Sequence, residues 1–357
     1  MPPVLRLVVD ARVISEDTRG IGRYARAILR RLIVRNDVEL TLLAFGPLAF
    51  RERGPYAKAL GSDAFAVRAY VGRDAEVVWH PANGTFFSST SPSVVTIHDA
   101  VPFRYPDGDA RRRHHAQAPF LRSARTASRF IAVSDFGRAE IAEVFAVPPE
   151  RIDVIYHGVE PSFAPGIAQP LPPGVRSGRY VLFVGDPIGE PRKNFNLLYD
   201  AYRRAWPAND GAPALVVAGP QAPRLAGVVH AGNIGDDLNA RAADEGLRAL
   251  YRGAIALGLA SYHETFGMPM IEAMACGTPV IASQASSLPE IGGTAALYAP
   301  PDDAGAWAGA LRRVADDAAL RDRLRIAGLD RATHFNWDES ADTHLSVFRT
   351  VAGRHSP

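Results

Sequence analysis

Two carboxylates and two adjacent cations carry the most informative chemistry in this sequence. Glu264 and Glu272 both lie in the segment Leu257–Ser283, and Arg192 and Lys193 are neighbours near the middle of the chain. Carboxylates near an anion site would repel phosphate but can accept hydrogen bonds from sugar hydroxyls, whereas paired cations suit a phosphate. The alternatives are a solvated Glu264, a Glu272 that interacts only with its helix dipole, and two exposed loop cations.

A predicted strand, loop and helix position the two carboxylates. Leu257–Ser283 reads LGLASYHETFGMPMIEAMACGTPVIAS, which predicts a strand ending near Ser261 and a helix over Pro269–Cys276 that Gly277 terminates. Proline is favoured in the first helical turn and glycine just past the last one. The free N–H groups at the start of this helix therefore point at the mouth of the sheet and favour an anion there.

The cations follow a second strand. Tyr180–Val184 is predicted as a strand, and Asn194 is predicted to cap the helix that ends at Arg204. Cations at a helix start are unfavourable unless an anion shares the site. Lys58 and Lys193 are the only lysines among 40 basic residues, so an ammonium group at position 193 is a small hint of a specific role.

The first half offers weaker candidates. His98 ends a strand at the mouth of the sheet, and Gly22 belongs to a GxG sequence that opens a helix. A structural histidine and a flexible turn are the alternatives. Asp107 and Asp109 have the spacing of a metal-binding pair, but their turn-like setting favours no metal. The basic stretch at Arg111–Arg113 is either a solvated face or a contact with anionic lipid or a phosphate-bearing acceptor.

Length and composition bound the remaining possibilities. The chain has 357 residues, which is room for about two domains, and its net charge of +2 argues against bulk nucleic-acid binding. A single cysteine, Cys276, cannot form an internal disulfide. The N-terminus lacks the features of a signal peptide and no apolar run approaches the roughly 18 residues of a membrane span, so we expect a cytoplasmic protein.

Alternating strands and helices predict the architecture. Buried parallel strands read as continuous apolar runs, and such runs occur on both sides of a Pro- and Gly-rich stretch, Pro161–Gly174. We therefore predict an α/β protein with two doubly wound, Rossmann-like domains facing a cleft, joined by this linker. Open sheets of this kind bind ligands at the carboxyl ends of their strands. The predicted strands are Leu5–Val9, Glu39–Ala44, Val77–His80, Val94–His98, Phe130–Val133, Asp153–Tyr156, Tyr180–Val184, Ala214–Ala218, Ala256–Ala260 and Pro279–Ala282.

These motifs resemble a known family. The two glutamates with seven residues between them, the EPRKN string at Glu190–Asn194 and the sequence Ile97-His98-Asp99 are similar to motifs of retaining glycosyltransferases of family 4, which have the GT-B fold. The resemblance covers nearly the whole chain. Asp186 stands where many relatives carry arginine or a small residue, and His157 stands where asparagine is common.

The resemblance implies a role for each matching residue. Glu264 would hold the donor hexose, Arg192 and Lys193 would bind its diphosphate, and His98 would lie beside the reacting sugar. Donor binding would also involve Gly22, Phe266, Gly267, Met268 and Glu272. Residues 1–168 would form the acceptor-side domain and 169–337 the donor-binding domain, with the helix 338–357 crossing back to the first.

The resemblance also suggests substrates. It favours transfer of mannose from GDP-mannose to a hydroxyl of a glycan or lipid-linked acceptor, without a metal ion or cofactor, with peripheral contact at the inner face of the membrane through the basic stretch. A UDP-hexose donor is the first alternative. A non-catalytic protein that binds sugar nucleotides on the same fold, and an epimerase or phosphorylase, are the others.

Overall fold

A computed structural model describes residues 3–15, 20–44, 49–208, 211–232 and 240–353. The chain forms two compact units, Met1–Gly158 with Trp337–Pro357 (unit 1) and Val159–Asn336 (unit 2). The boundary differs from the predicted one at residue 168, because the start of the linker packs on unit 2. There the Arg252 guanidinium donates to the carbonyl oxygen of Ala164 at 2.8 Å, and the ring of Phe163 contacts that of Tyr251.

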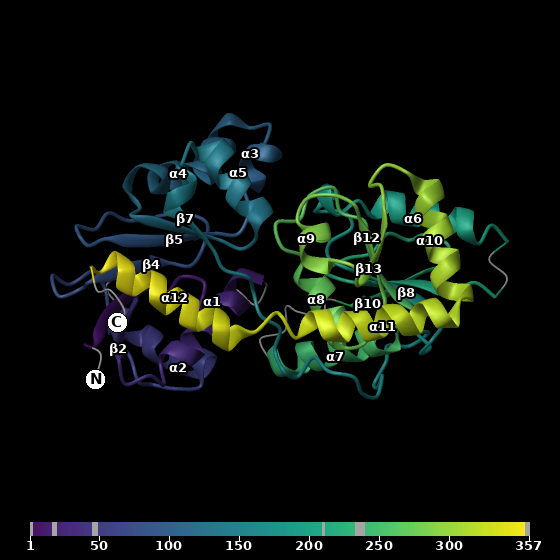
Figure 1. Ribbon diagram of the computed structural model, residues 1–357, viewed down its shortest axis with the longest axis horizontal. Helices are drawn as coiled ribbons and strands as arrows, with labels where there is room; N and C mark the ends of the chain where they lie inside the picture. The colour runs from purple at the N-terminus through teal and green to yellow at the C-terminus, as the bar shows by residue number, and fades with distance from the viewer. Residues whose placement is uncertain (1–2, 16–19, 45–48, 209–210, 233–239, 354–357) are drawn as a thin grey trace. The chain divides into compact units, whose positions relative to one another are not determined.

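Unit 1 is built on a seven-stranded parallel sheet with the order β3-β2-β1-β4-β5-β6-β7. Continuous apolar runs form its central strands, and helices cover both faces (Figure 1). The strands are β1 (Leu5–Asp10), β2 (Val38–Leu43), β3 (Ala66–Arg68), β4 (Val77–His80), β5 (Ser93–Ile97), β6 (Arg129–Ala132) and β7 (Ile152–Val154). The helices are α1 (Gly20–Leu32), α2 (Arg53–Leu60), α3 (Val101–Arg104), α4 (Ala110–Thr126), α5 (Asp135–Phe145) and α12 (Trp337–Val351), with short 3₁₀ turns at Ala49–Glu52 and Pro149–Arg151.

Unit 2 repeats this plan with a six-stranded parallel sheet in the order β10-β9-β8-β11-β12-β13. The strands are β8 (Tyr180–Val184), β9 (Ala214–Ala218), β10 (Val228–Gly232), β11 (Ala256–Leu259), β12 (Val280–Ser283) and β13 (Ala296–Ala299). The helices are α6 (Phe195–Ala205), α7 (Ala240–Gly253), α8 (Met268–Ala275), α9 (Leu288–Gly292), α10 (Ala304–Asp316) and α11 (Ala318–Ala332), with a 3₁₀ turn at Pro191–Lys193. The predicted fold class, α/β with two doubly wound Rossmann-like halves, is confirmed.

Each sheet contains one point at which the strand order reverses. In unit 1 this switch point lies between β1 and β4, and in unit 2 it lies between β8 and β11. Helices that follow neighbouring strands there leave to opposite faces, which opens a crevice at the carboxyl ends of the strands. Ligand sites are therefore expected just after β1 and β4, and just after β8 and β11.

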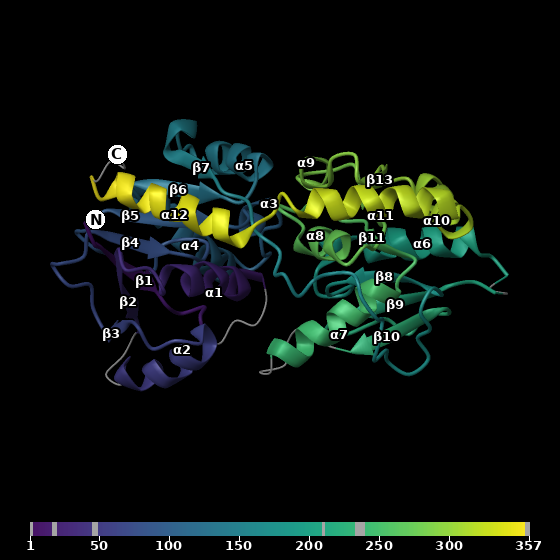
Figure 2. The ribbon, with the colours of Figure 1, turned by 60° about the horizontal axis from the view of Figure 1, so that its bottom comes forward.

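The C-terminal helix α12 packs on α1 and on strands β4 and β5 of unit 1 (Figure 2). Its buried face includes Leu345 and Phe348, and its first turns pair with arginines of the α1 region. Arg31 contacts Asp338 at 2.5 Å, and Arg35 contacts Asp342 at 2.6 Å. Apolar burial and complementary charge together explain why the end of the chain belongs to unit 1. Within the part of the chain that the structure describes, no helix is long and apolar enough to cross a membrane.

Candidate active site

The predicted phosphate and sugar residues meet at the switch point of unit 2. Lys193 and Arg192 lie on the segment between β8 and α6, and Glu264 lies on the loop between β11 and α8. The backbone N–H of Tyr262 donates to the carbonyl oxygen of Arg192 at 2.8 Å, which joins the two loops directly. The strand order alone brings these segments together, although 71 residues separate Lys193 from Glu264.

Lys193 and Glu264 form a buried ion pair. The Nζ atom of Lys193 donates to Oε1 of Glu264 at 2.6 Å, and the Ser261 hydroxyl donates to the same oxygen at 2.9 Å. Arg192 lies on the other side, with Nη1 at 3.6 Å from Oε2 of Glu264 and Nη2 at 2.9 Å from Oε1 of Glu190. An ammonium has three N–H donors, so Lys193 can hold Glu264 and still donate to a ligand.

Glu264 stays ionised although its side chain is buried. Burial acts to raise the pKa of this carboxyl group, but the charges of Lys193 and Arg192 and the hydrogen bonds from Lys193 and Ser261 outweigh it, so the pKa of Glu264 lies below its usual value. An ionised carboxylate accepts hydrogen bonds and donates none. Glu264 is therefore suited to accept from the hydroxyl groups of a bound sugar.

Two serines after β12 fix the backbone of Glu264. The Ser286 hydroxyl accepts from the Glu264 N–H at 2.9 Å, and the Ser287 hydroxyl donates to the Glu264 carbonyl oxygen at 2.7 Å. Ser286 has a positive φ of 51°, a conformation that non-glycine residues rarely adopt. The sequence analysis missed both residues, and the serine pair four residues after the predicted strand Pro279–Ala282 was the signal that could have found them.

The backbone after β9 lies very close to the backbone after β8. A Cβ atom on Gly219, which follows β9, would lie 2.0 Å from the carbonyl oxygen of Gly185, and Gly185 itself has a φ of 140°. A side chain at position 219 would thus clash with backbone. Asp186 folds back in a turn, where its Oδ1 accepts from the N–H groups of Ile188 and Gly189 at 3.0 and 2.8 Å. Position 186 therefore adds a carboxylate to the loop after β8, where the resemblance indicated arginine or a small residue in many relatives.

Glu272 lies in α8 and is held by a tyrosine. The Tyr251 hydroxyl donates to Oε2 of Glu272 at 3.0 Å, and the Thr278 hydroxyl donates to the carbonyl oxygen of Tyr251 at 2.6 Å. The Glu272 side chain is buried. The structure therefore places the second glutamate on the helix, as predicted, with a fixed orientation that a solvated surface glutamate would lack.

The three other donor-binding candidates of unit 2 form the junction between the Glu264 loop and α8. Gly267 is the N-cap residue with φ of 90°, and Met268 is the first helical residue. Phe266 is buried and packs edge to face on Phe335 with ring centroids 5.7 Å apart. The aromatic contact anchors the loop, and the left-handed Gly267 turns the chain so that the first N–H groups of α8 face the loop.

The role predicted for Asn194 is wrong. It occupies the N-cap position of α6, but its side chain makes no cap hydrogen bond. Its Nδ2 atom instead donates to the carbonyl oxygens of Ala260 and Pro301 at 3.0 and 2.8 Å. Asn194 has a positive φ of 55°, and its side chain reaches the carboxyl end of the neighbouring strand β11. It ties the Lys193 segment to the end of β11, so it positions the cation loop and does not cap the helix.

His98 lies at the carboxyl end of β5 in unit 1, where its ring is held from several sides. Its Nε2 atom donates to the carbonyl oxygen of Pro81 at 2.8 Å, and its backbone N–H donates to Oδ1 of Asn83 at 2.6 Å. The ring of His157 stacks on it at 5.5 Å between centroids, and the ring of Tyr24 meets it edge to face at 4.7 Å. His98 is thus a buried, oriented side chain at the mouth of the sheet.

A chain of hydrogen bonds joins this cluster to α12. Indole Nε1 of Trp79 donates to the Thr96 hydroxyl at 3.0 Å, and the Thr96 and Tyr24 hydroxyls are 2.9 Å apart. Tyr24 contacts Nε2 of His344 at 2.5 Å, and Nδ1 of His344 donates to the carbonyl oxygen of Ser340 at 2.6 Å. Since that carbonyl can only accept, Nδ1 carries the proton of a neutral His344, and Nε2 accepts a hydrogen bond from the Tyr24 hydroxyl. Burial lowers the pKa of His344 to about 4, in agreement with the neutral form.

Because two histidines of this cluster are buried in the neutral form, we predict that the folded protein is less stable in mild acid than at neutral pH. His344 has a folded pKa of about 4 and an ordinary unfolded value near 6.5, so the unfolded chain takes up its proton first as the pH falls. The stabilisation from His344 is fully present above pH ~6.5. As the pH falls toward ~4, the free energy of unfolding decreases by on the order of 3 kcal/mol. Burial also lowers the pKa of His157, which adds in the same direction.

Urea unfolding at pH 7 and pH 4.5 measures this loss. We expect His344→Gln to reduce the difference between the two pH values, because glutamine can accept from Tyr24 and does not titrate. The exposed His334→Gln is the control and should leave the difference unchanged. Equal pH dependence in the wild type and His344→Gln would show that His344 does not carry the effect.

The remaining candidates of the first half have local structural partners. Gly22 is buried in the first turn of α1. Asp109 caps α4 by accepting from the N–H groups of Arg111 and Arg112, and Asp107 pairs with Arg112 at 2.9 Å. Arg111–Arg113 thus begins α4, and Arg112 folds back onto the turn that precedes it. The two aspartates act as turn and cap residues here.

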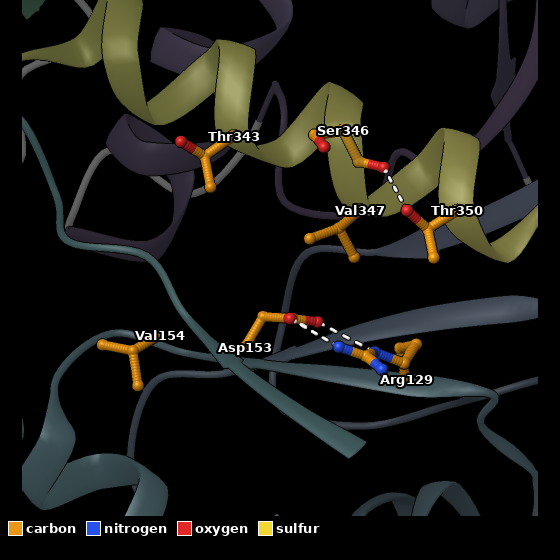
Figure 3. Close-up of a pocket in the computed structure, with 7 residues that line it drawn as sticks. All are labelled: Arg129, Asp153, Val154, Thr343, Ser346, Val347 and Thr350. Carbon is orange, nitrogen blue, oxygen red and sulfur yellow. Dashed lines mark hydrogen bonds and ion pairs between the residues drawn. The ribbon is translucent and has the colours of Figure 1, made fainter. Parts of the chain in front are cut away.

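A cavity of about 240 Å³ lies elsewhere in unit 1, between α12 and strands β6 and β7 (Figure 3). Arg129 and Asp153 pair across its floor, with their closest atoms at 2.5 Å. Thr343, Ser346 and Thr350 of α12 line the opposite wall. None of the residues predicted from the motifs lines it. The cavity has a mixed polar and apolar lining, and His98 is not among its lining residues.

Comparisons with known proteins agree with this division into two units. The family model described as Glycosyltransferase Family 4 matches residues 18–163, and the model described as Glycosyl transferases group 1 matches residues 176–331. O-antigen chain mannosyltransferase B of Escherichia coli is 26% identical over 399 residues, which covers 97% of this chain and 100% of that protein. A D-inositol 3-phosphate glycosyltransferase of Stackebrandtia nassauensis is 32% identical over 241 residues, or 61% of this chain and 54% of that one.

Solved structures share the architecture. Sucrose-phosphate synthase from Thermosynechococcus elongatus superimposes with a TM-score of 0.68 at 19% sequence identity, over 98% of this chain and 99% of that one. At this identity the likeness concerns the fold. One family model matches each unit, so the chain carries a Glycosyltransferase Family 4 domain in unit 1 and a Glycosyl transferases group 1 domain in unit 2, on a fold that is shared over nearly its whole length.

Proposed function

We propose that unit 2 binds a nucleoside diphosphate sugar at its switch point and that the protein transfers the hexose to a hydroxyl of a glycan or lipid-linked acceptor. The observation that carries the proposal is the buried cluster of Lys193, Arg192 and an ionised Glu264 on loops that follow β8 and β11. The cations suit the diphosphate and the carboxylate suits the sugar hydroxyls. Glu272, oriented by Tyr251, is suited to accept from the ribose.

The geometry supports a charge-based mechanism. Cleavage of the anomeric bond leaves positive charge on the sugar and negative charge on the departing phosphate. Fixed donors aimed at that phosphate stabilise the transition state more than the ground state. Lys193 and Arg192 supply such donors from a rigid setting, since Glu264 and Glu190 hold them in place. We propose retention by same-face attack, in which the departing phosphate oxygen accepts the acceptor proton as the new glycosidic bond forms.

The donor we propose is GDP-mannose. The support is the EPRKN string at Glu190–Asn194 and the full-length similarity to an O-antigen chain mannosyltransferase. A UDP-hexose is the alternative donor. A thermal-shift screen against GDP, UDP, ADP and their sugars decides between them, because a ligand that binds only the folded chain raises its Tm. A rise with GDP and GDP-mannose alone is expected, whereas no rise with any nucleotide would refute the proposal.

Turnover separates a transferase from a protein that only binds. Incubation of the shifting donor with a panel of glycan acceptors should yield the lengthened glycan and the free nucleoside diphosphate. Binding without turnover over a broad panel would favour the non-catalytic alternative. Isomerised sugar nucleotide would indicate an epimerase, and a requirement for free phosphate would indicate a phosphorylase.

We also predict that transfer needs no added divalent metal ion. Lys193 and Arg192 already place cationic N–H donors where the diphosphate is proposed to bind, which is the stabilising role that Mg²⁺ has in other phosphate sites. The initial rate in excess EDTA should therefore equal the rate in magnesium buffer. A rate that EDTA abolishes and Mg²⁺ restores would contradict the prediction.

A further inference from the structure

The switch point of unit 1 carries two side chains that the proposed donor site does not use. Arg12 comes just after β1, which ends at Asp10, and Phe86 lies in the segment that follows β4, which ends at His80. β1 and β4 are adjacent, and the strand order reverses between them. By the rule that placed the donor site of unit 2, this is where a ligand of unit 1 is expected.

Arg12 is held rigidly by a buried pair. Its Nε atom donates to Oδ1 of Asp10 at 2.9 Å and its Nη2 atom to Oδ2 at 2.5 Å, while Nδ1 of His80 lies 3.3 Å from the same Oδ2. Asp10 is only 3% exposed, whereas the Arg12 side chain is 35% exposed. The guanidinium is thus presented to solvent in a fixed orientation. The exposed part of this guanidinium can donate hydrogen bonds to the oxygen atoms of a polar ligand.

Phe86 stacks on this guanidinium and is itself exposed. The guanidinium carbon of Arg12 lies 3.3 Å from the centroid of the Phe86 ring, so one face of the ring is covered. The residue is nevertheless 42% exposed. Single exposed apolar side chains are common on protein surfaces, so the exposure of Phe86 alone indicates nothing. Its position beside a fixed guanidinium, at the end of the sheet where ligands bind, is what suggests a partner.

The segment that carries Phe86 is fixed on both sides of it. A Cβ atom on Gly84 would lie 2.6 Å from the carbonyl carbon of Pro119, and the Thr85 N–H donates to the Pro119 carbonyl oxygen at 3.2 Å. The ring of Phe87 packs on that of His80 at 4.7 Å. This segment also holds His98, through Asn83 and Pro81. A flat apolar surface is therefore rigidly attached to the segment that orients His98.

We propose that Phe86 and Arg12 bind a pyranose ring of the acceptor glycan. A pyranose has an apolar face of C–H groups that can stack on an aromatic ring, and peripheral hydroxyls that can bond to a guanidinium–carboxylate pair. The inference rests on the proposed function, because it names the sugar-binding surface for the acceptor. It commits to a neutral sugar ring, and lipid or phosphate contact at this surface is an outcome of the test.

Saturation-transfer NMR on the full chain tests the proposal without turnover. The probes are the methyl glycosides of mannose, glucose, galactose and N-acetylglucosamine, added without nucleotide. We expect transfer to the C–H protons of at least one glycoside, retained in Phe86→Tyr and at least about tenfold weaker in Phe86→Ala. Phe86→Leu should also lose it, because leucine is apolar but offers no flat ring. Tyr70→Ala removes a 72% exposed aromatic beyond the edge strand β3 and should change nothing.

The outcomes are distinguishable from those of the donor test. Transfer that persists in Phe86→Ala, or no transfer to any glycoside in the wild type, overturns the proposal. Binding of phosphatidylglycerol vesicles or inorganic phosphate that depends on Phe86 and Arg12, without glycoside binding, also overturns it. If glycosides bind through Phe86 but no nucleotide raises the Tm, the proposed glycosyl transfer fails while the sugar-binding surface stands.

Discussion

Lys193→Ala is expected to lower the rate of sugar transfer by about 10²–10³-fold, the loss that follows removal of one fixed donor to a developing oxyanion. The Nζ atom of Lys193 is 2.6 Å from Glu264 and only about a tenth of its side chain is exposed, so water cannot easily replace it. Turnover with saturating donor measures the effect. Thermal shift with nucleoside diphosphate shows whether donor binding weakens as well.

The chain supplies a matched control for this prediction. Lys58 is the only other lysine, and it is exposed on α2. Lys58→Ala should therefore keep full turnover. Lys193→Ala also leaves Glu264 with Arg192 and Ser261 alone, which raises the pKa of Glu264 and lowers the Tm, so far-ultraviolet circular dichroism must first show a folded protein. A folded Lys193→Ala variant with normal turnover would contradict the role that we propose for Lys193.

The fold was largely readable from the sequence because interior strands have a distinctive pattern. The central strand β8 is apolar throughout, and β1 departs from this only at Arg6 and Asp10, since helices cover both faces of each sheet. Three strands were not predicted: β3, β10 and β13. All three lie at sheet edges, where their burial is incomplete, and β3 and β10 also contain the polar residues Arg68 and His230. The missed elements are therefore those that the hydrophobic core constrains least.

The candidate site was predictable where it depends on residues next to strand ends. The residue types and the parallel-sheet rule sufficed to bring Lys193 and Glu264 together. Residues that position them from far along the chain were not predictable, because their partners depend on tertiary structure. The Asn194 amide was expected to cap its own helix, yet it binds the carbonyl oxygen of Pro301, 107 residues away. Likewise Tyr24 reaches His344 across 320 residues.

The two sheets place different chemistry at equivalent points. In unit 2 the switch point holds two cations, each paired with a carboxylate, and a glycine where backbone approaches closely. In unit 1 it holds one cation, Arg12, which is paired with a buried aspartate and stacked on an aromatic ring. The same topology thus offers two adjacent cationic donors in one unit and a flat aromatic surface beside a single ion pair in the other. This difference suits a donor that carries a diphosphate and an acceptor that is a sugar.

Glu264→Gln is expected to separate donor binding from transfer. Glutamine has nearly the shape of glutamate and can still accept from Lys193 and Ser261, but it carries no charge. The positive charges of Lys193 and Arg192 would then be less compensated, so we expect nucleoside diphosphate to bind at least as tightly as to the wild type. Sugar transfer should fall by about 10²-fold, because the ionised acceptor for the sugar hydroxyls is lost and the hexose is less well oriented.

Isothermal titration with GDP and UDP, together with turnover, measures both parts of this prediction. The matched control is Glu190→Gln, which removes the other carboxylate beside Arg192 but leaves the Lys193–Glu264 pair intact. It should tighten nucleotide binding slightly and keep most of the turnover. If Glu264→Gln weakened nucleotide binding and reduced transfer only in proportion to that loss, Glu264 would be a structural partner of Lys193 only. Its buried charge at 2.6 Å from Lys193 would then serve to hold the cation loop in place.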